Sequence, residues 1–230
     1  MTVIDFHSHI IPTIDHGCQS LDECESQLEL MGKTTAVAVA TPHFYPHIHK
    51  TDSFNAKVAT AVNQIKELHI ECAPNICVGA EVLLCEGLEE MSELGSLCIR
   101  GTRCLLIELP THTLRRGHFD TIEALIASGY TVLLAHIDRY FKICLDDIDT
   151  LLNMGALAQI NSDALFHHST MKRITKYLET TKSICALGSD LHGANANAYN
   201  SFLKAPKALK EYYETIMQRA EKLVIEAETI

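Results

Sequence analysis

The sequence predicts an α/β protein built on parallel β-strands, and three observations support this. Short apolar runs alternate with longer helical patterns along the whole chain of 230 residues. Several runs are almost continuous in Val, Ile, Leu and Ala, which is typical of parallel strands buried on both faces. Seven such strands alternate with helical segments. That pattern indicates a closed or nearly closed barrel, with a doubly wound open sheet as the alternative.

The strands are expected where these apolar runs occur. Their ranges are Val3–Phe6, Val37–Thr41, Ile76–Ala80, Cys104–Glu108, Thr131–Ala135, Leu157–Ile160 and Ile184–Gly188. No glycine-rich phosphate loop follows the first strand, which disfavours a nucleotide-binding open sheet. No linker, low-complexity segment or sequence repeat divides the chain, so we expect a single domain over residues 1–230.

The helices are expected between the strands. Ser20-Leu21-Asp22-Glu23 has the form of a capping box and begins a helix that reaches about Lys33. The other expected helices are Phe54–Leu68, Asp120–Ser128, Asp147–Met154, Met171–Thr180 and a long C-terminal helix, Ala205–Ala227. Gly129 and Gly155 stand where helix-ending glycines belong.

Composition argues against several classes of protein. The formal net charge of −10 leaves no surplus of Lys and Arg for nucleic acid as the main partner. No apolar run approaches bilayer length, and the N-terminus lacks the pattern of a signal peptide, so we expect a cytoplasmic protein without membrane insertion. The nine cysteines are scattered without a C-x-x-C motif, as expected for thiols in a reducing cytosol. None has Arg six positions later, as a cysteine-based phosphatase would, so phosphatase activity would need another nucleophile.

Six of the seven expected strands end in His, Asp or Glu. The residues at or just past these ends are His7, His9, His43, Glu81, Glu108, His136, Asp190 and His192. Active sites of parallel α/β folds are built at this edge. His7 and His9 are two apart on an extended segment, so both can chelate one ion. Asn161 ends the remaining strand, where we expect it to donate or accept a hydrogen bond behind the ligands.

Imidazoles and carboxylates without thiolates suit Zn, Fe or Mn. A carboxylate such as Glu81 can bridge two ions, and neighbouring metals can clamp a phosphate and generate hydroxide at neutral pH. The residues alone therefore predict a metal cluster at these strand ends, of a kind that can clamp a phosphate group.

The motifs at these strand ends resemble the polymerase-and-histidinol-phosphatase (PHP) superfamily. They are Asp5-Phe6-His7-Ser8-His9, Thr41-Pro42-His43, Gly79-Ala80-Glu81, Leu106-Ile107-Glu108, His136-Ile137-Asp138-Arg139-Tyr140 and Ser189-Asp190-Leu191-His192. Within the superfamily they are most similar to the bacterial manganese-dependent protein-tyrosine phosphatases of capsule and exopolysaccharide operons. The likeness runs from residue 4 to the C-terminus, in the family's order and spacing.

The resemblance implies a distorted seven-stranded β/α barrel that holds two or three divalent ions, Mn first, with Fe or Zn as alternatives. It assigns ligands by position: His7, His9, Glu81 and Asp190 to one ion, Glu81, Glu108 and His136 to a second, and His16, His43 and His192 to a third. It also implies that Arg139 binds the phosphate and that a metal-bridging hydroxide is the nucleophile. One departure concerns the third ion. The family usually has Asp-Asp-Gly where Asp15-His16-Gly17 stands, and an imidazole at position 16 removes a negative charge.

The substrate that the resemblance implies is phosphotyrosine on a protein, such as the Tyr-rich tail of a bacterial tyrosine kinase. Two alternatives remain: a small-molecule phosphatase such as histidinol phosphatase, and a non-catalytic module that binds metal or phosphate. A nuclease on the same scaffold is disfavoured by the charge of −10. Barrels of this kind often associate, so a homo-oligomer is compatible with the sequence.

Overall fold

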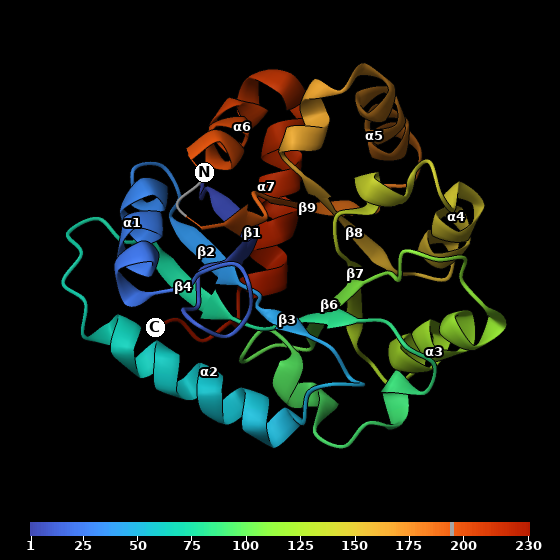
Figure 1. Cartoon of the computed structure of the whole chain (residues 1–230). Coiled ribbons are helices and arrows are strands. Elements are labelled where there is room, and N and C mark those ends of the chain that lie inside the picture. Colours follow the sequence, from blue (N-terminus) through green and yellow to red (C-terminus); the bar gives the residue numbers. More distant parts are fainter. Residues whose placement is uncertain (194–195) are drawn as a thin grey trace.

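The computed structural model describes residues 1–193 and 196–230, with the side chains after the gap described from Tyr199 onward. Parallel strands occupy the centre and helices surround them (Figure 1). The strands are β1 (Ile4–His9), β2 (Val37–Ala40), β3 (His43–Phe44), β4 (Asn75–Val78), β5 (Glu81–Leu83), β6 (Cys104–Glu108), β7 (Thr131–Leu134), β8 (Leu157–Asn161), β9 (Ile184–Gly188) and β10 (Leu191–His192).

Seven α-helices and four short 3₁₀ helices connect these strands in the described ranges. The α-helices are α1 (Leu21–Gly32), α2 (Thr51–Lys66), α3 (Arg116–Ala127), α4 (Leu145–Asn153), α5 (His168–Thr180), α6 (Ala196–Leu209) and α7 (Glu211–Val224). The 3₁₀ helices are η1 (Leu88–Glu90), η2 (Leu94–Leu97), η3 (Ile137–Tyr140) and η4 (Asp163–Phe166). In the part of the chain that the structure describes, no helix combines the length and the apolar character needed to cross a membrane.

All seven predicted strands are present, but the predicted strand count is wrong. The described strands form a four-stranded sheet in the order β10-β1-β2-β4 and a six-stranded sheet in the order β3-β5-β6-β7-β8-β9, with parallel pairing throughout. Three predicted strands continue after a break as a short second strand in the other sheet. Pro42, which has no N–H to donate, separates β2 from β3. Asp190, with a left-handed φ of 52°, separates β9 from β10.

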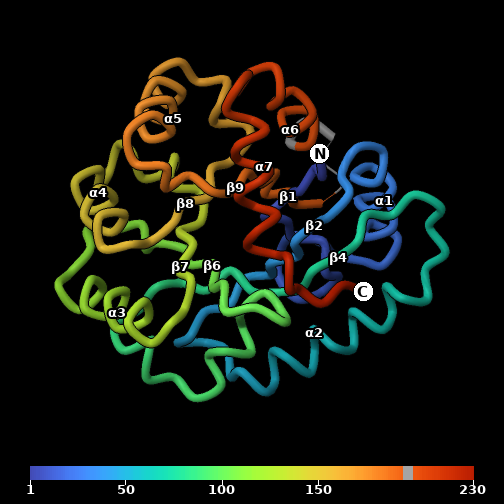
Figure 2. Tube along the Cα trace, turned by 180° about the vertical axis from the view of Figure 1, so that it is seen from behind, coloured from blue at the N-terminus to red at the C-terminus, as the bar shows by residue number. Residues whose placement is uncertain are grey.

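Burial of both strand faces explains why the strands are apolar. In β6, the consecutive residues Leu105, Leu106 and Ile107 are all buried, so both faces of this strand are covered. Figure 2 shows the same chain from behind, where α7 crosses the side of the sheets formed by β9 and β1. Ile216 and Met217 of α7 are buried, and the Ile4 N–H donates to Met217 Sδ at 3.5 Å.

The predicted start of α1 is confirmed, since Ser20 Oγ accepts a hydrogen bond from the Glu23 N–H. The Glu23 carboxylate accepts from the Gln19 N–H, so the capping box is modified. Helix α3 begins four residues before the predicted start at Asp120. Its N-cap is Arg115, a residue type that does not signal a helix start, and the side chain of His118 accepts from the Arg115 N–H instead.

The long C-terminal helix predicted over Ala205–Ala227 is wrong. The structure has two helices separated at Lys210, where φ is 50° and ψ is −123°. This backbone conformation ends α6 and turns the chain into α7. Gly129 and Gly155 follow α3 and α4 with φ of 83° and 108°, which confirms their helix-ending role.

Candidate metal centre

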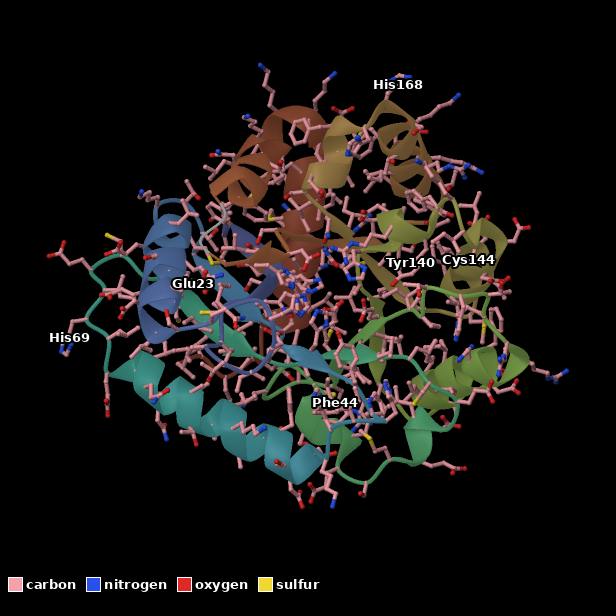
Figure 3. All side chains as sticks on the ribbon, in the orientation of Figure 1. Glu23, Phe44, His69, Tyr140, Cys144 and His168 are labelled. Carbon is pink, nitrogen blue, oxygen red and sulfur yellow. The ribbon has the colours of Figure 1, made fainter. Side chains whose placement is uncertain are left out.

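The predicted strand-end residues gather at one place in the fold. Figure 3 shows side-chain nitrogen and oxygen atoms crowded near the middle of the view, where the ends of the central strands meet. Four groups of three residues each present one ligand atom, and within each group these atoms lie within 4.8 Å of one another. The groups are His7, His9 and Asp190; His7, Glu81 and His136; His43, Glu81 and Glu108; and His9, His43 and His192.

His7 and His9 of β1 are fully buried and point to the same side, as their spacing predicts. Their Nε2 atoms are 3.1 Å apart. Glu81 Oε2 lies 3.2 Å from His7 Nε2 and 3.3 Å from His9 Nε2. Asp190 Oδ1 lies 3.6 and 3.3 Å from the same two nitrogens. These four side chains therefore face one point.

Glu81 lies at the centre of the cluster. Its Oε1 is 2.7 Å from His136 Nε2, and its Oε2 is 2.9 Å from His43 Nδ1. Glu108 approaches the same region, with Oε2 3.8 Å from His43 Nδ1. A carboxylate that faces several imidazoles with separate oxygens has the arrangement needed to bridge two cations.

The donor set fits transition-metal ions. Each group combines imidazoles, or imidazoles and carboxylates, and includes no cysteine. His192 Nε2, in the group formed with His9 and His43, is buried and has no hydrogen-bond partner among the described residues. An unsatisfied buried nitrogen is rare in proteins, and a ligated cation would satisfy it.

The sequence matches the model of one protein family over almost its whole length. The family model for capsular polysaccharide synthesis, CpsB/CapC, matches residues 3–227. The chain belongs to this family.

Similar proteins are curated as tyrosine-protein phosphatases. Tyrosine-protein phosphatase CpsB of Streptococcus pneumoniae is 25% identical over 94% of this chain and 90% of its own length. Putative tyrosine-protein phosphatase CapC of Staphylococcus aureus is 29% identical over 93% of this chain and 87% of its own length. One solved structure, from a crystallographic description of YwqE from Bacillus subtilis and CpsB from Streptococcus pneumoniae as metal-dependent tyrosine phosphatases, superposes with a TM-score of 0.79. It covers 99% of this chain and 96% of the other at 21% identity, which establishes the shared fold.

In the cluster of this CpsB/CapC family member, burial and the neighbouring charges shift the pKa values of the carboxyl groups in opposite directions. Burial would raise the pKa of the Glu81 and Asp190 carboxyls, but the charge of His7 and hydrogen bonds from imidazoles hold both pKa values well below the usual range. Burial lowers the pKa of His192 to about 4 and also lowers the pKa of His136. The carboxylates are thus ionised and these two imidazoles neutral near pH 7, the forms that bind metal.

Two predicted ligands lie in left-handed backbone conformations. His136 has a φ of 30° and Asp190 a φ of 52°. Such values are uncommon for residues other than glycine and cluster at functional sites. Asp190 is also held by its neighbours, since Asn161 Nδ2 donates to Asp190 Oδ2 at 2.9 Å, which confirms the hydrogen bond expected at the end of β8.

His16 lies beside the cluster but outside all four groups. Its ring centroid is 4.6 Å from that of His192 and 5.0 Å from that of His43, and the residue is exposed to solvent. The neighbouring Asp15 is turned inward. Its Oδ2 accepts hydrogen bonds from His9 Nδ1 at 2.7 Å and from the His43 N–H at 2.9 Å. Asp15 therefore orients His9 rather than facing the centre of the cluster, and a ligand role for His16 stays a prediction.

Arg139 lies at the edge of the cluster. Its Nη2 donates to Asp190 Oδ2, and its side chain is 51% exposed. A guanidinium that is half exposed and anchored by a buried carboxylate can still turn N–H groups toward an anion. The phosphate-binding role of Arg139 is compatible with this position and stays a prediction.

Gln159 is a site residue that the sequence analysis missed. It is fully buried in β8, and its Oε1 accepts from the His136 N–H at 2.6 Å and from His7 Nδ1 at 3.2 Å. Its Nε2 donates to Asn161 Oδ1 at 2.9 Å. These bonds leave His7 Nε2 free to face the cluster. An amide within an otherwise apolar strand, two residues before Asn161 on the same face, was the available signal.

Proposed function

We propose that this chain is a metal-dependent phosphatase that hydrolyses phosphotyrosine on a protein substrate in capsule or exopolysaccharide synthesis. The observation that carries the proposal is the convergence of eight of the nine predicted ligands into four mutually close groups. The curated relatives support tyrosine phosphate as the substrate, and the family description supports the pathway. Histidinol phosphatase and a non-catalytic module have no corresponding support among these relatives.

The residues would hold the ions as follows. We assign His7, His9, Glu81 and Asp190 to one ion, Glu81, Glu108 and His136 to a second, and His16, His43 and His192 to a third. The proximity of His9 to His43 and His192 supports His9 as a ligand shared with the third ion. When bound, divalent cations of this type lower the pKa of water and neutralise the charge of a phosphoryl group. Manganese is our first choice, with iron or zinc as alternatives.

The protein's own side chains would bind and orient the substrate. Arg139 would bind phosphate oxygens through the N–H groups that its bond to Asp190 leaves free, and would stabilise negative charge that develops during hydrolysis. Asp15 and Gln159 accept hydrogen bonds from the Nδ1 atoms of His9 and His7. Both imidazoles are thereby kept in the tautomer that presents Nε2 to the centre.

Several finer assignments belong to the same proposal. The two sheets would act as one distorted barrel, supported by β10 pairing with β1 directly after β9 and by the Asp190 N–H donating to His7 O at 2.8 Å. Residues 1–230 would form a single domain, supported by one continuous core. We place the protein in the cytoplasm, with the tail of a bacterial tyrosine kinase as substrate and a homo-oligomer as a compatible state.

Metal content and turnover test the proposal together. Metal per chain would be measured by elemental analysis, and hydrolysis of p-nitrophenyl phosphate and of a phosphotyrosine peptide would be followed before chelation, after chelation and after Mn²⁺ addition. We expect bound transition metal, loss of activity on chelation and recovery with Mn²⁺. His69→Ala removes a histidine that lies outside the four groups, and this variant should keep the metal content and turnover of the wild type. A protein that binds no metal and stays inactive with Mn²⁺ would refute the proposal.

A further inference from the structure

A hollow of about 440 Å³ opens beside the candidate metal centre, between η3, η4 and the first turn of α5. Arg139 belongs to both places, because it bonds to Asp190 and also lines the hollow. A second hollow, of about 700 Å³, follows α5 and shares Ser169 and Arg173 with the first. Figure 1 places α5 at the upper right of the view. We call the two hollows together the α5 groove, and its lining includes Arg139, Lys142, Ser169, Lys172, Arg173 and Lys176.

The α5 groove is positive in a chain that is negative overall. Five Lys or Arg residues line it against three carboxylates, whereas the whole chain has 19 Lys and Arg against 29 Asp and Glu. Lys176 follows Lys172 by four residues and Arg173 by three, so it shares a face of α5 with each of them. Apart from Arg139, none of these cations forms an ion pair within the described part of the chain.

The three carboxylates offset this charge only in part. Asp138 is engaged, since its Oδ1 accepts from the Asn161 N–H at 2.8 Å. Glu179 lies near the C-terminal end of α5, six residues past Arg173 and away from the metal centre. Asp163 in η4 is the remaining one. The first turn of α5 contains no acidic residue that would offset the positive end of the helix dipole. The dipole therefore adds to the positive potential of the groove.

We propose that the α5 groove binds acidic residues that flank the phosphotyrosine of a protein substrate, which rests on the proposed function above. A phosphotyrosine held at Arg139 would place the adjoining chain at the mouth of the groove. An extended peptide advances about 3.3 Å per residue, so a few flanking residues reach along the N-terminal half of α5. Asp or Glu at these positions would pair with Lys142, Lys172 and Arg173. The net charge of −10 on the whole chain would repel a long nucleic-acid backbone, which favours a short acidic peptide.

The test compares two phosphotyrosine peptides that differ only in having Glu or Gln on both sides of the phosphotyrosine. The Mn²⁺-loaded full chain, Arg173→Glu and the control Lys66→Glu on α2 would be assayed with both peptides and with p-nitrophenyl phosphate at low salt. We expect kcat/KM for the Glu peptide to exceed that for the Gln peptide several-fold. Arg173→Glu should lower kcat/KM for the Glu peptide about tenfold, because an attraction becomes a repulsion. It should leave p-nitrophenyl phosphate and the Gln peptide within about twofold of wild type, as Lys66→Glu should for all three substrates.

Equal kcat/KM for the two peptides in the wild type would overturn this inference, as would an equal loss on all substrates in Arg173→Glu. Binding of the fluorescein-labelled peptides, followed by anisotropy, separates the inference from the proposed function. If nothing is hydrolysed, the proposed function fails, yet tighter binding of the Glu peptide that Arg173→Glu abolishes would still support the groove. Displacement of the Glu peptide by a single-stranded oligonucleotide as readily as by unlabelled peptide would overturn the preference for a peptide.

Discussion

The bond between Asp15 and His9 offers a sharp test of how this metal centre is built. Asp15 accepts three hydrogen bonds: Oδ2 accepts from His9 Nδ1 at 2.7 Å and from the His43 N–H at 2.9 Å, and Oδ1 accepts from the Gly17 N–H at 2.8 Å. The resulting bonds hold the pKa of Asp15 well below its usual range, although burial acts in the opposite direction. The carboxylate therefore keeps a proton on His9 Nδ1 and leaves Nε2 free for a metal.

Asp15→Asn keeps the shape of the side chain but replaces one acceptor oxygen with a donor NH₂ group. If that group faces His9, the imidazole accepts through Nδ1 and carries its proton on Nε2, the form that cannot bind metal. If the NH₂ group faces Gly17, it meets the Gly17 N–H, so two donors point at each other and neither has an acceptor. Loss of a partner behind a ligating histidine typically costs 10–100-fold in metal affinity, or about 1.4–2.8 kcal/mol.

The assay is a titration of the apo protein with Mn²⁺ against a competing chelator, with p-nitrophenyl phosphate turnover measured at each metal concentration. We expect a weaker apparent metal affinity for Asp15→Asn, with kcat largely recovered at excess Mn²⁺. Asp22→Asn, on the exposed start of α1, serves as the control. An affinity for Asp15→Asn within about twofold of wild type would refute the reasoning.

Four further predictions follow from the same geometry. Arg139→Lys should lower kcat/KM for p-nitrophenyl phosphate by about 10²-fold, because Lys lacks the planar fork for phosphate, and unchanged kcat/KM would contradict a role in phosphate binding. Gly188→Ala should weaken metal binding and lower the free energy of unfolding by about 1–3 kcal/mol, because the added Cβ would stand 2.5 Å from His7 Cβ. The control Gly95→Ala, whose Cβ would meet only the Tyr130 hydroxyl at 3.6 Å, should unfold like the wild type in thermal denaturation. Saturating Mn²⁺ at about 100 times its Kd should stabilise the chain by about 2.7 kcal/mol, or roughly 5–11 °C in Tm, and an identical Tm with chelator would argue against a built site. Nearby carboxylates and hydrogen bonds outweigh burial and raise the pKa of His7 and His9 above the usual 6.5, so protons should compete with metal near neutral pH. Chelator competition should therefore show an Mn²⁺ affinity that rises from about pH 6 to 8.

Patterns that repeat along the chain carried most of the fold prediction. All seven predicted strands exist, because burial on both faces requires continuous apolar runs that local sequence reveals. The cap at Ser20 and the glycines at 129 and 155 were also readable, since each acts within a few residues. The start of α3 and the break at Lys210 were missed, because neither residue type is one that usually marks a helix boundary.

Residue type and strand register were enough to name the cluster. His7, His9, Glu81 and Asp190 are each the kind of residue that binds metal, and parallel strands bring their C-terminal ends to one edge. Local sequence could not show which of these side chains face one another across strands. The inward turn of Asp15, the grouping of His9 with His43 and His192, and the bonds of Gln159 to His7 and His136 all join distant segments.

The same division applies to the α5 groove. The spacing of Lys172, Arg173 and Lys176 is visible in the sequence. These cations can act together with the metal centre only because η3 brings Arg139 to the end of the same groove. Periodicity and residue chemistry are local properties that every segment carries with it. Distances between side chains from different segments depend on how strands break, pair and pack, and this chain acquires them only on folding.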